Sequence, residues 1–224
     1  MGPAIGDTLP FAVGIALSPI PIIAVILMLF SARARQNGPA FLGGWLGGVA
    51  AVVVVVTLIT GAAGASSGGP STLASLIKLA LGILLLVLAW LQWKKRPVPG
   101  MEPEVPKWMA QVDTMQPTQA FILGVVLSGV NPKNLTLGIG AALVIGSAGL
   151  DLVESFITVL VFVAVASISI AVPVIYYLVG GDSAKQTLDG WKAWLSEHNA
   201  VVMTVLLLVM GVVLAGKGFG GLIG

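Results

Sequence analysis

Apolar residues follow one another in six long runs, and each run is long enough for a helix that crosses a lipid bilayer. A hydrocarbon core about 30 Å thick needs about 20 helical residues. We therefore expect an all-α integral membrane protein with six transmembrane helices. These helices are predicted over residues 8–31, 39–62, 72–93, 120–147, 153–179 and 199–216.

Two polar segments separate some of these runs. Residues 94–119 form a charged, proline-rich linker. Within residues 182–199, Leu188, Trp191 and Trp194 fall on one helical face. Tryptophans on an amphipathic helix favour headgroup depth, so this segment predicts a short helix in the plane of the interface. The alternative is an ordinary polar connector.

The composition excludes a soluble protein. Hydrophobic residues make up 57% of the 224 residues and charged residues only 9%, whereas a soluble domain has about 25% charged residues. The mean hydropathy is +1.04. The absence of cysteine excludes disulfides and thiolate metal sites.

Basic residues lie almost entirely on one side of the predicted bundle. On the opposite side, Lys217 is the single basic residue in a connection or a terminus. Lys78 and Lys133 lie within predicted spans. This asymmetry indicates membrane orientation and not nucleic-acid binding, and it places both termini outside the cytoplasm. The connections that we assign to the cytoplasm carry Arg33, Arg35, Lys94, Lys95, Arg96, Lys107, Lys185 and Lys192.

The chain contains an internal repeat. Residues 11–18 align without gaps to residues 121–128, with Phe, Gly, Leu and Ser at matching positions. A repeat of three helices enters the membrane from opposite sides in its two copies, as in many secondary transporters. We expect one half over residues 1–93 and an inverted half over residues 120–224, joined by the linker.

Each copy of the repeat is followed by a proline motif near the middle of a predicted helix. A proline lacks the N–H group of a helical hydrogen bond and breaks or bends the helix. Ser18 and Asn131 suit the N-cap position of a new half-helix, with Pro19 and Pro132 following them. Helix starts favour anions, so the two breaks predict a substrate site at mid-membrane; the alternative is two ordinary kinks. The candidate residues are Ser18, Pro19, Pro21, Ser128, Gly129, Asn131, Pro132, Lys133 and Asn134.

Lys133 is an ionisable residue in the middle of a predicted span, where such residues are costly and commonly functional. It either binds an anionic group of the substrate, or it snorkels or pairs with a backbone carbonyl. No aspartate or glutamate lies deep in a predicted span, and the single histidine, His198, lies at a helix end. We therefore expect no metal site, no cofactor and no catalytic residue.

Other small and polar positions predict packing. Gly43 with Gly47, and Gly44 with Gly48, are spaced for close helix contact, within the chain or in a homo-oligomer. Ser167 and Ser169 can line a path through the predicted helix 153–179.

The Ser-Pro-x-Pro motif at residues 18–21, the Asn-Pro-Lys-Asn motif at 131–134, the six spans and the proline-rich linker resemble the LysE superfamily of exporters. Within it, the likeness is greatest to the GAP or sulfolipid-1-addressing protein (Sap)-like family. The resemblance implies export of a small solute or a lipid-linked glycoconjugate across the bacterial cytoplasmic membrane. We expect a transporter that works by alternating access on a polar, anionic or lipid-type substrate. The alternatives are an amino-acid exporter of LysE type and an accessory protein that delivers a lipid intermediate to a partner.

Overall fold

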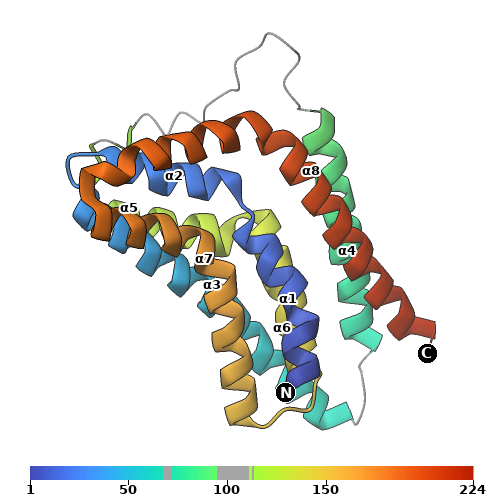
Figure 1. Ribbon diagram of the computed structural model, residues 1–224. Coiled ribbons are helices and arrows are strands. Elements are labelled where there is room, and N and C mark those ends of the chain that lie inside the picture. The colour runs from blue at the N-terminus through green and yellow to red at the C-terminus, as the bar shows by residue number, and fades with distance from the viewer. Residues whose placement is uncertain (68–71, 95–110, 113, 224) are drawn as a thin grey trace.

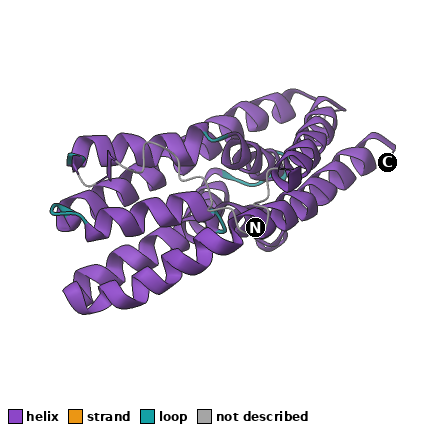
Figure 2. Cartoon of the chain, turned by 90° about the horizontal axis from the view of Figure 1, so that it is seen from above, coloured by secondary structure: helices purple, strands orange, loops and turns teal. Residues whose placement is uncertain are grey.

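The computed structural model describes residues 1–67, 72–94, 111–112 and 114–223, and of residues 63–67 only the backbone. The described residues are helical nearly throughout and contain no strand (Figure 2). The elements are α1 (Gly2–Ala16), α2 (Pro19–Phe30), α3 (Ala34–Ser67), α4 (Thr72–Lys94), α5 (Pro117–Val125), the π-helix η2 (Val126–Val130), α6 (Pro132–Gly146), α7 (Leu152–Gly180), the 3₁₀ turn η3 (Gly181–Ala184) and α8 (Lys185–Ile223). Most of the predicted linker lies outside the described residues.

The helices confirm an all-α membrane protein. In the described part of the chain, three helical stretches are long and apolar enough to cross a membrane: Ala34–Ala62, Thr72–Lys94 and Leu152–Ile223. The count is up to five if each of two bent helix pairs is one span. The stretch Leu152–Ile223 includes both α7 and α8, and Gly181 with a φ of 57° lies between them.

The two bent pairs are located at the proline motifs. The axes of α1 and α2 differ by 54°, and those of α5–η2 and α6 by 61°. Pro19 and Pro132 are the first residues of α2 and α6, after the N-cap residues Ser18 and Asn131. The predicted helix breaks are therefore confirmed, with each proline in the first turn of a new helix, where it is tolerated. The side chain of Asn131 caps α6, whereas Ser18 makes no side-chain bond to α2.

The π-helix η2 accommodates a length difference between the two repeat copies. α2 begins one residue after Ser18, whereas α6 begins four residues after the matching Ser128. The three additional residues lie at the end of η2, where the N–H of Asn131 donates to the carbonyl of Val126 at 3.1 Å. A wide turn of this kind absorbs inserted residues and is frequent at functional sites.

Helices that are distant in the sequence pack in pairs. α1 packs against α7, α3 packs against α5, and α4 packs against α8 (Figure 1). α8 first passes over α2 and then runs alongside α4 (Figure 1). It continues through Asn199, so the predicted interfacial segment and the last predicted span are one helix. The reason is local: no glycine or proline occurs between Trp191 and Met210 to end the helix.

Small residues let α3 approach α5 and η2 closely. A Cβ at Gly44 would collide with the carbonyl of Phe121, and a Cβ at Gly48 would collide with the hydroxyl of Ser128. The face of α3 that carries Gly44 and Gly48 is therefore occupied within the chain. A Cβ at Gly47 would meet nothing within 4 Å, and one at Gly43 would lie 3.8 Å from the ring of Phe121, so this face of α3 is packed less closely within the chain.

Candidate functional site

The two helix breaks meet in the interior of the bundle. The Nζ of Lys133, on the first turn of α6, donates to the Oγ of Ser18 at 2.5 Å. The Oγ of Ser18 also lies 3.2 Å from the Oδ1 of Asn134. The exposed fractions of Ser18, Lys133 and Asn134 are 3%, 6% and 1%. Three of the nine predicted residues thus form one buried polar cluster.

The carbonyl groups at the end of α1 all have partners. The N–H of Leu17 donates to Val13 O at 2.9 Å, and the N–H of Ser18 donates to Ala16 O at 2.9 Å. Side chains supply the rest: Lys133 Nζ donates to Gly14 O at 2.7 Å, and Ser18 Oγ lies 2.6 Å from Ile15 O. From α7, Ser169 Oγ donates to Ala16 O at 2.6 Å. The carbonyls of Val13 to Ala16 thus have partners at a depth where an unpaired carbonyl is costly.

The Nζ of Lys133 lies at the C-terminal end of α1. The last turn of α1 carries a partial negative charge, which stabilises an ammonium group. No carboxylate of the described residues forms an ion pair with Lys133. Of the two expectations for this residue, the structure shows pairing with a backbone carbonyl. An ammonium has three donors, and two of them have partners among the described residues.

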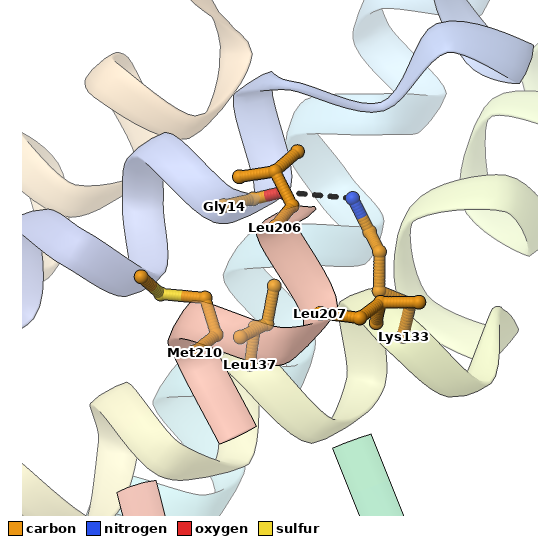
Figure 3. A pocket seen from close by; sticks show the side chains of 6 residues that line it. All are labelled: Gly14, Lys133, Leu137, Leu206, Leu207 and Met210. Atoms are coloured by element: carbon orange, nitrogen blue, oxygen red, sulfur yellow. Dashed lines mark hydrogen bonds between the residues drawn. The ribbon is translucent and has the colours of Figure 1, made fainter. Parts of the chain in front are cut away.

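A small pocket lies beside this ammonium (Figure 3). Apart from Lys133, the pocket has an apolar lining, and it is too narrow for a water molecule. α8 contributes three of the lining side chains. All three are apolar, so their positions could not be recognised as part of a site from the sequence. The lining residues are Gly14, Lys133, Leu137, Leu206, Leu207 and Met210.

The helix starts offer few free donors. Pro19, Pro21 and Pro132 have no N–H group, and the N–H of Lys133 donates to the Oδ1 of its N-cap Asn131 at 3.0 Å. In the first turns of α2 and α6, this leaves the N–H groups of Ile20 and Asn134 without a partner among the described residues. Each helix start therefore contributes a single amide, and Lys133 contributes the formal positive charge.

The remaining candidate residues have structural contacts. Ser128 donates to Val125 O at 3.2 Å, and both Ser128 and Gly129 lie against Gly48 of α3. Pro19 and Pro21 are buried in the first turn of α2, and Pro132 is exposed. The side chain of Asn134 donates to Leu127 O at 2.9 Å and thereby joins α6 to η2.

The Ser18 hydroxyl contacts Lys133 Nζ, Ile15 O and Asn134 Oδ1. Among the described residues there is no group of three or more metal-binding side chains.

Two broken helices that meet at a buried lysine define a membrane protein with discontinuous helices, a feature found at binding sites in membrane proteins. A model of the family described as Sap, sulfolipid-1-addressing protein, matches residues 8–220. The chain belongs to this family, which confirms the predicted likeness to Sap-like proteins. The likeness to the wider LysE superfamily stays a prediction. Neither the curated proteins nor the solved structures gave a match to the chain.

Proposed function

We propose that this protein is an exporter that carries an anionic amphiphile or a small polar anion across the bacterial cytoplasmic membrane. The main observation behind this proposal is the contact between the two broken helices, in which Lys133 Nζ lies 2.5 Å from Ser18 Oγ. Membership of the Sap family links the chain to sulfolipid addressing by the name of that family. The transport step itself is our inference.

Six spans in two inverted halves explain the helix pairs. In this arrangement α1–α2, α3 and α4 correspond to α5–η2–α6, α7 and α8. The contact of α1 with α7 then has its counterpart in the contact of α5 with α3, and α4 and α8 are the two third helices. Such pairing favours a two-fold axis in the membrane plane, around which one half can move against the other.

An anionic group can replace a backbone carbonyl as the partner of Lys133. In the closed arrangement, neutral oxygens of Gly14 and Ser18 hold the ammonium. A full negative charge attracts an ammonium more strongly in a low-dielectric interior than a carbonyl dipole does. Once α6 has separated from α1, binding of the anion would therefore hold the two apart and permit the halves to move.

The lining of the pocket favours an amphiphile. In the closed arrangement this pocket admits no water and has an apolar surface, so a head group reaches Lys133 only once α6 has separated from α1. The apolar side chains of α6 and α8 beside Lys133 then suit the apolar body of an amphiphile. A LysE-type amino-acid substrate needs an acceptor for its ammonium group as well. The carbonyls at the α1 break that could serve already have partners, so this alternative has less support.

Reconstituted vesicles test the proposal. We would insert the purified chain into vesicles that contain a fluorescent phosphatidylglycerol and follow its movement between leaflets, with fluorescent phosphatidylcholine and radiolabelled lysine as the comparison substrates. We expect protein-dependent movement of the anionic lipid that is faster than that of the zwitterionic lipid. Movement of lysine alone would establish the amino-acid exporter instead. Activity that appears only with a partner protein would establish the accessory role, and equal rates in empty vesicles would overturn the proposal.

A further inference from the structure

A second charged cluster lies at the end of the bundle where α1 begins and α8 ends (Figure 1). Lys217 of α8 forms an ion pair with Asp7 of α1, with a distance of 2.8 Å between Nζ and Oδ1. Both side chains are partly open to the outside, with exposed fractions of 33% and 58%. The pair joins the first half of the chain to the second, 210 positions apart.

Lys78 of α4 lies beside this pair. A Cβ at Gly218 would collide with the backbone of Leu79 and Ser75, so α8 and α4 touch at the level of both lysines. Asp7 pairs with Lys217, and Lys78 has no ion pair of its own among the described residues, so the cluster contains two lysines and one carboxylate.

Both lysines lie near the ends of their helices, where we expect lipid headgroups. Each lies six residues from a helix end, Lys78 from Thr72 and Lys217 from Ile223, which is about 9 Å along a helix. Long basic side chains at this depth extend their charge toward the headgroup region. Large apolar side chains beside them face outward, with exposed fractions of 50% for Leu76 and 57% for Phe219.

We propose that Lys78 and Lys217 form a second anion site, which binds the phosphate or sulfate group of an anionic bilayer lipid, and that the Asp7 carboxylate occupies this site when no lipid is bound. The excess of one positive charge attracts the anion. The exposed apolar side chains contact its acyl chains, which distinguishes a lipid from free phosphate. This site lies apart from the one at Lys133 and goes beyond the proposed transport function.

Native mass spectrometry of the full chain in non-ionic detergent tests this site, with phosphatidylglycerol as the probe and phosphatidylcholine as the neutral comparison. Replacement of one lysine, Lys78→Gln or Lys217→Gln, should weaken phosphatidylglycerol binding roughly two- to fivefold, the factor that one partly exposed charge pair contributes. Asp7→Asn removes the competing carboxylate and should strengthen binding. Lys78→Arg and Lys217→Arg keep the charge and should keep the affinity.

A matched control is available on the same chain. Lys185 and Lys192 each have their own carboxylate, Asp182 and Asp189, at 2.8 and 2.6 Å. Lys185→Gln with Lys192→Gln should therefore leave the affinity of this site unchanged. The proposal fails if Asp7→Asn weakens binding as Lys217→Gln does, because the ion pair would then only hold α1 to α8. It also fails if phosphatidylcholine binds equally well or if excess inorganic phosphate displaces the lipid.

The readout is equilibrium binding, so its outcome is separate from that of the transport assay. Lipid binding at Lys78 and Lys217 can persist if the chain moves no substrate. Conversely, transport through the site at Lys133 can persist if these two lysines bind no lipid.

Discussion

Lys133 donates a hydrogen bond to the carbonyl oxygen of Gly14 at 2.7 Å, across 119 positions of the chain. The contact places the ammonium of α6 on the C-terminal end of α1, where the helix dipole is negative. In this arrangement the lysine joins α6 to the end of α1. Under the proposed function, the same side chain also responds to an anionic substrate.

Lys133→Met tests this double role. The substitution keeps an unbranched side chain but removes the charge, so we expect transport of an anionic lipid to fall by at least about tenfold, since a hydrogen bond to a charged group contributes about 1.5–3 kcal/mol. Thermal unfolding in detergent should change little, because loss of the desolvated charge offsets loss of its hydrogen bonds. Lys133→Arg should retain part of the activity. Wild-type transport in the Met variant would exclude Lys133 from substrate binding.

Two serines of α7 should respond in opposite ways. Ser169→Ala removes the donor to Ala16 O and should destabilise the protein by about 0.5–1.5 kcal/mol. Ser167 is buried but its hydroxyl has no hydrogen-bond partner among the described residues, so Ser167→Ala should be neutral or stabilising. Thermal unfolding of the two variants checks the difference; equal losses would mean that the bond to Ala16 contributes nothing specific.

The contact of α3 with η2 depends on a glycine. Gly48→Ala introduces a Cβ that would overlap the Ser128 hydroxyl and lie against Val125 O, and overpacking of this kind costs about 1–3 kcal/mol. Gly47→Ala is the control, since its Cβ meets open space. We expect Gly48→Ala to lower the unfolding temperature and Gly47→Ala to leave it unchanged. Similar behaviour of both variants would contradict the close packing.

The sequence predicted the breaks because each proline follows a residue that suits an N-cap. Pro19 and Pro132 directly follow Ser18 and Asn131, whereas Pro173, which follows a valine, lies inside the unbroken α7. The partner of Lys133 could not be predicted, because Gly14 contributes a backbone carbonyl, which has no signature in the side-chain pattern. The apolar residues of α8 in the pocket, such as Leu207, likewise resemble any membrane-facing residue until the helices are packed.

The same reasoning explains the differences in helix ends. Polar residues at 196–199 suggested a boundary, but serine, glutamate and histidine are tolerated inside a helix, and α8 continues through them. Ser18 was expected to cap α2, yet its hydroxyl lies 2.6 Å from Ile15 O and makes no side-chain bond to the first turn of α2. The hydroxyl can bond either to a carbonyl of α1 or to an N–H group of α2. The angle between the two helices determines which bond forms, and this angle cannot be predicted from the sequence.

The proposed orientation has a direct test, because the chain contains no cysteine. Single cysteines at Ser183 and Ala148 would lie at exposed positions in the α7–α8 and α6–α7 connections. From the distribution of basic residues, we predict that a membrane-impermeant thiol reagent modifies Ser183→Cys only from the cytoplasmic side and Ala148→Cys only from the outer side. The reverse pattern would place the termini in the cytoplasm.

The most direct measurement of alternating access at the helix breaks uses the same chemistry inside the pocket. Met210 lines the pocket beside Lys133 and has an exposed fraction of 8%. In oriented vesicles with an anionic lipid as substrate, we predict that Met210→Cys reacts with the impermeant reagent slowly but from both sides, while Ser183→Cys reacts from one. Reaction of Met210→Cys from one side only, or from neither, would contradict a site that opens alternately to the two faces of the membrane.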